Sequence, residues 1–478
     1  MSLDLPVAAK PLTDYNLNQE QRDAAEAFLE FLFSPEKEFI ISGAAGVGKT
    51  YLMNYIIDNT MPRYLEMCQL LSMPAIYDNV VMTATTNKAA DVLSQSVGRP
   101  AGTIHSFFNL TVRDDYSTGE TTIKKTTRWK IHQGKIIFID EASMIDTELW
   151  KTLHEGTQDC KLVYVGDRHQ LAPVQEDLSP VYKHNSPMVE LLQPMRNAGQ
   201  PALMAICQQL RDTVATGKFN PIRLVPGVID LLNGQDMQAE ILRVFQQQTH
   251  AARILAYTNK RVIEYNNHIR SIRSLPDRFT VGEYLVASSV VHTKTGNIPV
   301  ETELEVLVNH GADRIEIDPK HNIQLDVDYL DIKTSLGERY NRIPVMTNRQ
   351  HFDELTRYYS QVKVKDWTKF FYLKNNIADL RPRDAATVHK SQGSTYDTVF
   401  IDIGNISTCH QPQQVARMLY VAFSRARTRV FLYGDLASKY GGLDLSRSWV
   451  AHQTASATSA ASTRLLPVPP ASGVATIA

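Results

Sequence analysis

The sequence predicts an α/β fold in which two domains are each built on a parallel β-sheet. Apolar, β-prone runs that precede helical patterns lie at residues 38–42, 79–84, 135–140 and 161–166. A second set of such runs follows at residues 253–257, 398–403 and 429–433. Apolar strands that alternate with helices are typical of parallel sheets covered on both faces. A chain of 478 residues also exceeds what one hydrophobic core supports, so several domains are expected.

Two segments interrupt this alternation. Residues 109–132 contain two polar, β-prone runs around the turn STGE, which indicates a β-hairpin. Residues 276–381 contain mostly short β-prone runs, which indicate a small β-barrel inserted into the second α/β domain. The first domain is therefore expected to comprise 1–108 with 133–180, and the second 181–275 with 382–450. The last stretch, 451–478, is rich in Ala, Ser, Thr and Pro and is expected to be disordered.

The composition is that of an ordinary globular protein, with 43% apolar and 21% charged residues. No apolar run is long enough to cross a bilayer, and the N-terminus lacks the pattern of a secretory signal, so a cytoplasmic protein is expected. The four cysteines are scattered without a CxxC pair, which favours reduced thiols over a zinc site or disulfides. The net charge is −1, so any surface that binds nucleic acid must be a local groove.

Residues 43–50, GAAGVGKT, fit the phosphate-binding pattern G-x-x-x-x-G-K-[ST], with a strand before them and a helical pattern after them. Glycines let backbone N–H groups close around phosphates, and the helix N-terminus adds partial positive charge. In this pattern Lys49 reaches the β- and γ-phosphates, and the Thr50 hydroxyl is a ligand of Mg²⁺. The correct flanks favour a nucleotide site over a chance glycine-rich loop.

Further charged residues would complete a site that hydrolyses ATP. Asp140 and Glu141 end an apolar strand, where the first can hold Mg²⁺ and the second can polarise the attacking water. The alternative is a solvated acidic turn, which the position after a buried strand disfavours. An arginine that stabilises charge on the transferred phosphoryl group is also needed, and Arg196 and Arg425 are the candidates.

An ordered set of motifs between about residues 17 and 435 resembles the superfamily 1B DNA helicases of the Dda and RecD type. The segments that carry the resemblance are LNQEQ, GAAGVGKT, TATTNKAADVL, TIHSFF, IDEAS, VGDRHQLAPV, MRN, LAYTNKRVIEYN, TVHKSQGSTYDTVFID and LYVAFSRAR. The last two are nearly diagnostic. The resemblance implies two RecA-like P-loop domains with parallel sheets, a pin hairpin at 109–132 and an SH3-like barrel at 276–381. The sequence departs from the family pattern at two positions. Thr85 stands where relatives often carry Pro, and Asn87 stands where Dda-like enzymes can carry His.

The resemblance also implies roles around ATP and Mg²⁺. Gln21 would contact the adenine, Gln170 would sense the γ-phosphate, Arg196 would lie near it, and Arg425 would be the arginine finger. Thr50 and Asp140 would hold Mg²⁺. The residues expected to surround the nucleotide are Gln21, Gly43, Ala44, Ala45, Gly46, Val47, Gly48, Lys49, Thr50, Tyr51, Gln392 and Gly393.

The implied partners are single-stranded DNA and a duplex fork, bound by a monomer that moves 5′ to 3′, with a single-strand-binding protein or other replication proteins as further partners. The residues implied to grip the strand are Thr86, Asn87, Thr103, His105, Asn259, Thr387 and His389. In the hairpin, Tyr116 is interpreted as a ring that stacks at the fork. The basic residues expected to hold nearby phosphates are Lys124, Lys125, Arg128 and Lys130. The alternative, which has equal weight, is that Tyr116 lies on an ordinary surface hairpin and has no role at the fork.

Three other functions stay open at this point. A P-loop ATPase that remodels protein would share Lys49 and Asp140 but would not need TIHSFF or TVHKSQG. A scaffold protein with a relic site is disfavoured by the complete set of Lys49, Asp140, Glu141 and Arg425. An RNA helicase of the same superfamily is excluded by no single residue, because nothing in the sequence discriminates against a 2′-hydroxyl.

Overall fold

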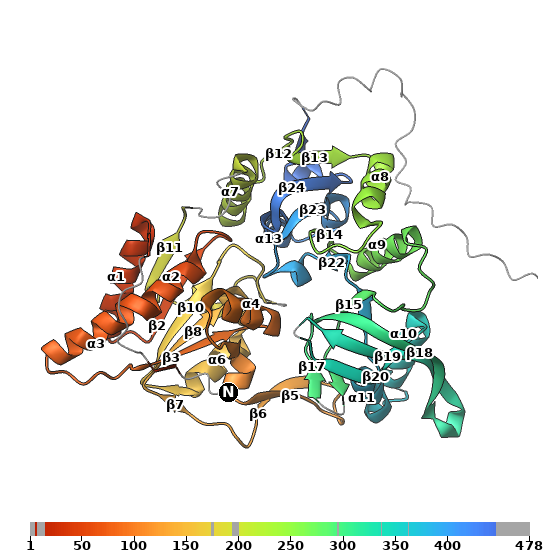
Figure 1. The fold of residues 1–478 in the computed structure, drawn as a ribbon, viewed down its shortest axis with the longest axis horizontal. Coiled ribbons are helices and arrows are strands. Elements are labelled where there is room, and N and C mark those ends of the chain that lie inside the picture. Colours follow the sequence, from red (N-terminus) through yellow and green to blue (C-terminus); the bar gives the residue numbers. More distant parts are fainter. Residues whose placement is uncertain are drawn as a thin grey trace, which may run out of the picture.

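The computed structural model describes residues 5–6, 15–173, 176–193, 200–293, 296–335, 337–361 and 363–445 (Figure 1). The expected tail at 451–478 and Arg196 lie outside these residues. Two α/β domains and a β-rich domain surround the centre of the view, and a hairpin extends from the first domain toward the β-rich domain (Figure 1). Among the described helices, none is long and apolar enough to cross a membrane.

The first domain has a seven-stranded sheet in the order β1-β3-β8-β10-β2-β11, with β4 beside β3. All its pairings are parallel except that of β1. Its strands are β1 (Leu5–Pro6), β2 (Glu38–Gly43), β3 (Asn79–Ala84), β4 (Gly102–Thr103), β8 (Lys135–Asp140), β10 (Lys161–Gly166) and β11 (Met188–Leu191). Its α-helices are α1 (Gln19–Phe33), α2 (Lys49–Tyr55), α3 (Met61–Leu70), α4 (Asn87–Val97), α5 (Ile104–Phe107) and α6 (Thr147–Glu155). The parallel sheet confirms the expected fold class.

One expected boundary is wrong. The division after residue 180 separated Met188–Leu191 from the first domain, but this strand, β11, pairs in parallel with β2. Leu191 is 1% exposed and packs in the core formed by α1, α2 and β2. The strand is short and its burial is uneven, so it lacks the continuous apolar run that marked the other strands.

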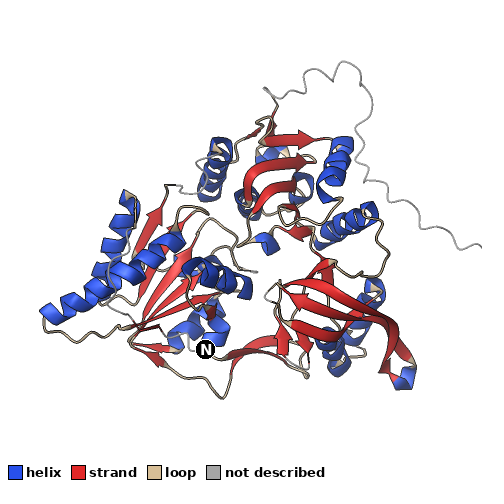
Figure 2. Ribbon diagram, in the orientation of Figure 1, coloured by secondary structure: helices blue, strands red, loops and turns tan. Residues whose placement is uncertain are grey.

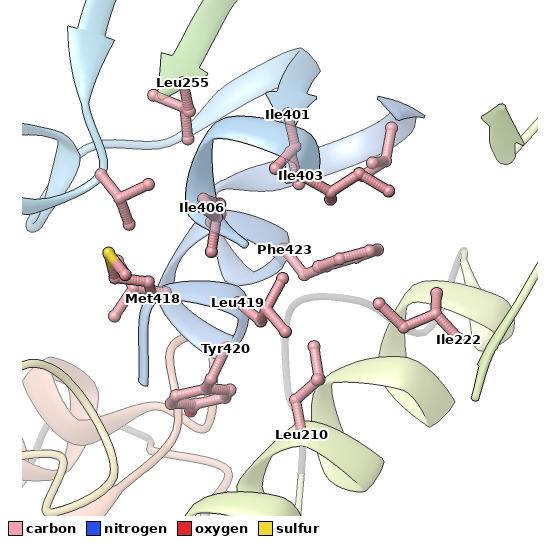
Figure 3. Packing of buried hydrophobic residues seen from close by; sticks show 14 of the residues in the cluster. Leu210, Ile222, Leu255, Ile401, Ile403, Ile406, Met418, Leu419, Tyr420 and Phe423 are labelled. Atoms are coloured by element: carbon pink, nitrogen blue, oxygen red, sulfur yellow. The ribbon is translucent and has the colours of Figure 1, made fainter. Parts of the chain in front are cut away.

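The second domain has a five-stranded parallel sheet in the order β13-β24-β23-β14-β22. Its strands are β13 (Ile229–Leu232), β14 (Ala252–Ala256), β22 (Ala385–Thr387), β23 (Tyr396–Asp402) and β24 (Ala426–Tyr433). Its α-helices are α7 (Pro201–Thr216), α8 (Gly234–Phe245), α9 (Asn259–Ile272), α12 (Ile403–Ile406) and α13 (Pro412–Ser424). Figure 3 shows part of its core, where Leu419 and Phe423 of α13 face Leu210 of α7.

The β-rich segment is a small barrel that also contains helices (Figure 2). Its sheet has the order β20-β19-β18-β15-β21, and a bridge between Val345 and Ala378 links the two ends. The strands are β15 (Tyr284–Ala287), β18 (Glu303–Asp318), β19 (Ile323–Thr334), β20 (Arg339–Met346) and β21 (Leu380–Pro382). The expectation of mostly short strands is wrong for β18 and β19. Two helices, α10 (Arg349–Ser360) and α11 (Trp367–Asn376), were not expected; they pack on β18, β19 and β20 through Phe352, Leu355 and Leu373.

The hairpin predicted within 109–132 is present. Strands β5 (Leu110–Asp114) and β6 (Thr121–Lys125) pair antiparallel, with Val112 opposite Ile123. The tip is closed by two backbone hydrogen bonds, from Gly119 N to Asp115 O at 2.8 Å and from Asp115 N to Glu120 O at 2.8 Å. The hairpin extends from the first domain as a two-stranded ribbon (Figure 1).

Candidate functional site: a nucleotide cleft between two domains

The phosphate-binding loop connects β2 to α2. Gly46 and Gly48 have φ values of 87° and 85°, a conformation that side chains rarely adopt, so the two glycines let the backbone turn back on itself. Gly43 is also required, because a Cβ there would lie 2.8 Å from Leu191 O and 2.8 Å from Val47 Cγ2. Lys49 Nζ donates to Gly43 O at 2.7 Å and to Ala44 O at 2.9 Å. The ammonium group thus lies inside the loop, where the phosphates of a nucleotide would replace these carbonyls as its partners.

Gln21 lies at the start of α1 beside this loop. The side chain is fully buried, and its Nε2 donates to Val47 O at 3.4 Å, which ties α1 to the loop. Its Oε1 accepts from Asn18 N at 3.2 Å as part of a capping box. Nearby, the Tyr51 hydroxyl accepts a hydrogen bond from Asn16 N at 2.9 Å, and the Tyr51 ring packs on Tyr15 at 5.2 Å between centroids. Tyr51 therefore holds the segment before α1 against the helix after the loop.

Asp140 is the last residue of β8, the strand two places from β2 in the sheet, and Glu141 follows it directly. Burial raises the pKa of Asp140, and the charge of Lys49 partly opposes this. Burial, and then the charge of Asp140, raise the pKa of Glu141 to about 7, while Arg425 and Lys49 lower it. Burial makes the charged forms of both carboxyl groups unfavourable. A divalent cation bound between them would compensate this charge, so the pair suits such a cation.

Residues of the second domain lie opposite this carboxylate pair. Gln392 Nε2 donates to Ser143 Oγ at 3.1 Å, and a Cβ on Gly393 would lie 3.6 Å from Glu141 Oε1. Arg425 is 3% exposed and donates to Ser394 O at 3.1 Å and to Val421 O at 3.2 Å. Its guanidinium is near enough to lower the pKa of Glu141. The structure thus brings Lys49, Glu141 and Arg425 together, although they are far apart in the sequence.

Gln170 follows β10, the strand between β8 and β2. The side chain is 4% exposed, and its Oε1 has no partner within the described residues. Asp167, three residues earlier, is fully buried, and sequence reasoning missed it. Burial alone would raise the pKa of Asp167, but hydrogen bonds from His169 and Tyr420, with the charges of Lys49 and Arg211, hold it at about 2. Its position at the end of a buried strand, like that of Asp140, was the signal that could have identified it.

The residues predicted to contact DNA lie at the carboxyl ends of neighbouring strands in each domain. In the first, Thr103 at the end of β4 pairs with Ala84 at the end of β3, and Thr86 caps α4 immediately after. In the second, Thr387 at the end of β22 pairs with Ala256 at the end of β14. The exposed Asn259 begins α9 just after β14. The parallel registers therefore group these residues on one edge of each sheet.

The local roles of these residues are also visible. Thr86, Thr103 and Thr387 each accept a hydrogen bond from a backbone N–H, at 3.1, 3.1 and 3.3 Å, so their hydroxyl protons stay available to donate. Burial lowers the pKa of His105 and of His389, which favours the neutral imidazole in each. Asn87 is the first residue of α4.

A small cavity beside the strand-end group of the second domain is lined by five basic and two acidic side chains. It has a volume of about 50 Å³ and is lined by Lys88 from the first domain with Asn259, Thr387, Arg381 and Lys390. Sequence reasoning missed Lys88, Arg381 and Lys390 as candidates. The signal was available for two of them, since Lys88 follows Asn87 and Lys390 follows His389.

The tip of the hairpin lies against α11 of the barrel. The Tyr116 ring is 5.1 Å from the Phe371 ring in an edge-on arrangement and is 55% exposed. Asn375 Nδ2 donates to Asp114 Oδ2 at 2.8 Å, and a Cβ on Gly119 would strike the Trp367 ring. The basic residues expected to hold phosphates, Lys124, Lys125, Arg128 and Lys130, are all exposed. Lys125 also pairs with Glu155 at 2.5 Å.

Comparison with known proteins finds two family models and two distant relatives that resemble this chain. A family model described as an AAA domain matches residues 16–220, and one described as a UvrD-like helicase C-terminal domain matches residues 384–433. The chain is 23% identical over 461 residues to the ATP-dependent DNA helicase dda of Enterobacteria phage T4. The alignment covers 88% of this chain and 100% of that protein. The chain is 22% identical over 509 residues to the uncharacterized protein R530 of Acanthamoeba polyphaga mimivirus. This alignment covers 86% of this chain and 99% of that protein. The phage match confirms the predicted resemblance.

Solved structures of Pif1 helicases are more distant likenesses. The Pif1 helicase from Bacteroides in complex with ADP-AlF3 and ssDNA has a TM-score of 0.47 and 15% identity, covering 90% of this chain and 95% of that one. The Pif1 helicase from Candida albicans has a TM-score of 0.44 and 17% identity, covering 90% of this chain and 97% of that one.

Proposed function

We propose, from the premise that this chain is a homologue of the Dda-type helicases of superfamily 1, that it is an ATP-dependent DNA helicase. It would move 5′ to 3′ along single-stranded DNA and unwind duplex DNA in replication, recombination or repair. The observation that carries the proposal is the composite cleft, in which Lys49 and Glu141 of one domain face Arg425 of the other. The proposed setting is the cytoplasm, that of the host cell if the chain is viral. A monomer would act at the fork beside a single-strand-binding protein or other replication proteins.

The cleft would couple ATP binding to domain movement, because residues of both domains would contact the same triphosphate. Lys49 would hold the β- and γ-phosphates, Arg425 would stabilise the charge that develops as the γ-phosphate leaves, and Glu141 would orient the attacking water. Mg²⁺, held by Thr50 and Asp140, would neutralise phosphate charge. Hydrolysis removes the bridge between the domains and lets them separate. A strand held by the strand-end residues of both domains would then be moved along stepwise.

The proposed activity is tested by ATP hydrolysis measured alone, with single-stranded DNA and with single-stranded RNA of the same sequence. We expect DNA to stimulate hydrolysis strongly, because a translocating enzyme turns over productively only on its track. Stimulation by RNA alone would show an RNA helicase. An absence of stimulation by either strand would contradict the helicase proposal and favour a different P-loop ATPase.

The direction of movement has its own test. A duplex with only a 5′ single-stranded tail should be unwound in the presence of ATP, and the same duplex with only a 3′ tail should not. The measurement is the release of a labelled strand. A blunt duplex serves as the control for fraying. Unwinding of the 3′-tailed substrate alone would contradict the proposed 5′ to 3′ polarity.

Tyr116 is proposed to act at the fork from the tip of the hairpin. We expect Tyr116→Ala to lower the rate of duplex unwinding roughly tenfold, because one aromatic stacking contact with a base is worth ~1–3 kcal/mol. DNA-stimulated ATP hydrolysis should stay near that of the unmodified protein, since Tyr116 lies outside the nucleotide cleft. Tyr116→Phe should unwind normally.

A matched control is Val112→Ala, since Val112 is 60% exposed on β5 of the same hairpin. It should change neither activity. Equal losses of hydrolysis and unwinding in Tyr116→Ala would show instead that the contact with Phe371 supports the fold. Unchanged unwinding would mean that Tyr116 does not act at the fork.

A further inference from the structure

The loop after β10, residues 167–171, belongs to the first domain in sequence but is bound to the second. The Tyr420 hydroxyl on α13 donates to Asp167 Oδ2 at 2.5 Å. Arg417, one turn earlier on α13, donates through Nη1 to Arg168 O at 2.8 Å and also to Gln170 O. A single nitrogen of the second domain therefore holds two backbone carbonyls of this loop.

Apolar packing reinforces these hydrogen bonds. Leu171 is 3% exposed and belongs to the core cluster of the second domain, together with Leu419 and Phe423. In Figure 3, Tyr420 points from α13 away from the body of this cluster, consistent with its hydrogen bond to Asp167. The loop is thus embedded in the second domain at its end and hydrogen-bonded to it along its length.

The groups that make this connection are buried, so losing a partner is costly. Asp167 and Tyr420 are fully buried and Arg417 is 7% exposed. A buried charge or carbonyl that loses its hydrogen bond is destabilised, because no water replaces the partner. The hydrogen bonds therefore define the position of the loop relative to α13.

A cavity adjoins this connection. It has a volume of about 500 Å³ and lies between Arg168, His169 and Glu190 of the first domain and Arg211 and Gln413 of the second. Across this cavity, Arg211 Nη2 donates to Glu190 Oε1 at 2.9 Å. Within the described residues, the hydrogen bonds of Arg417 and Tyr420 and the packing of Leu171 join α13 to the loop beside this cavity.

The loop that contains Gln170 starts beside the phosphate-binding loop, because Gly166 at the end of β10 pairs with Ser42, the residue before Gly43. The backbone carbonyl of Gln170 is held by Arg417, while its buried side-chain Oε1 has no partner within the described part of the chain. We infer that Arg417 is a positioning residue, which makes the loop follow the second domain and so places the Gln170 side chain according to the position of that domain. Movement of the second domain on DNA is thereby transmitted to the γ-phosphate side of the cleft. The inference rests on the proposed helicase function.

The test compares Arg417→Met with Arg417→Lys. Met keeps an apolar stem but removes the charged donors, whereas Lys keeps one charged group with three N–H donors, enough in number for both carbonyls. We expect Arg417→Met to lower the stimulation of ATP hydrolysis by single-stranded DNA by about tenfold or more, because two hydrogen bonds from a charged donor are lost. The KM for ATP should stay within about twofold, because Arg417 acts through Gln170 and not on the nucleotide. Arg417→Lys should restore most of the stimulation.

The matched control is Gln413→Met. Gln413 lies on the same helix and its Nε2 donates to Val214 O at 2.9 Å, a bond that stays within the second domain. This variant should be stimulated normally. Equal loss of stimulation in Gln413→Met and Arg417→Met would overturn the inference, because general packing of α13 would then explain both.

If Arg417→Met does not fold, as judged by its thermal unfolding, Tyr420→Phe carries the test. It removes only the hydrogen bond to Asp167 and should also lower the stimulation by DNA. Full stimulation in Tyr420→Phe, or in a folded Arg417→Met, would overturn the inference while leaving the helicase proposal intact. An unmodified protein that DNA does not stimulate would overturn both.

Discussion

Lys49→Ala will abolish ATP hydrolysis while leaving the binding of single-stranded DNA largely intact. Lys49 Nζ lies inside the phosphate-binding loop, 2.7 Å from Gly43 O, and no other described side chain donates to these carbonyls. Removing one preorganised donor that stabilises developing negative charge typically costs ~10²–10³-fold in turnover, and Lys49 would also help to bind the phosphates. Hydrolysis is measured by phosphate release, and DNA binding by fluorescence anisotropy of a labelled strand.

The control for this variant is Lys37→Ala, because Lys37 is exposed and precedes the opposite end of the same strand, β2. It should hydrolyse ATP normally. DNA binding survives in Lys49→Ala because the strand-end residues near Thr86 and Thr387 lie outside the loop. Turnover that DNA still stimulates in Lys49→Ala would contradict the assignment of the nucleotide site.

Arg425→Ala should lower kcat for ATP hydrolysis by about 10³-fold or more, the typical contribution of an arginine finger. The effect on the affinity for ATP should be much smaller, because the guanidinium acts mainly on charge that appears in the transition state. Its location supports this role, since Arg425 is buried and close enough to lower the pKa of Glu141 across the cleft. Single-turnover hydrolysis and equilibrium binding of a fluorescent nucleotide separate the two effects.

Arg427→Ala is the matched control. Arg427 is two residues further along, its side chain is 61% exposed, and its ion pair with Asp397 spans 3.4 Å. An exposed pair of this kind contributes little, so both kcat and stability should stay close to those of the unmodified protein. A collapse of ATP affinity in Arg425→Ala, with kcat preserved at saturation, would make Arg425 a ground-state ligand.

Much of the fold could be predicted because its strands have a local signature. The bounds expected for 79–84, 135–140 and 161–166 agree residue for residue with β3, β8 and β10. Strands buried on both faces require continuous apolar runs, and such runs are visible without any tertiary information. The hairpin was found for a similar reason, because its two β-prone runs flank a short polar turn.

The barrel was predicted less well. Helix α10 has apolar residues at helical spacing, Phe352, Leu355 and Tyr359, so a signal for it was present in the sequence. Helix α11 is harder to recognise, since its residues Trp367, Phe370 and Phe371 belong to types that also favour strands. The long strands β18 and β19 alternate buried with exposed residues and contain register shifts, which hides their length.

The sequence by itself determined the components of the proposed nucleotide site, because these components are short segments with local requirements. The loop needs glycines at fixed spacing, Lys49 must follow the loop, and Asp140 must end a buried strand. Each requirement is met within a few residues and is therefore visible in order along the chain.

Only the tertiary structure decided which of these segments meet. Tyr420 contacts Asp167, Gln392 contacts Ser143, and Asn375 contacts Asp114, in each case across more than two hundred residues. These partners have no shared local pattern, because their proximity depends on how whole domains pack against each other. For that reason the connection between residues 167–171 and α13, and the docking of the hairpin on α11, could not be predicted from the sequence.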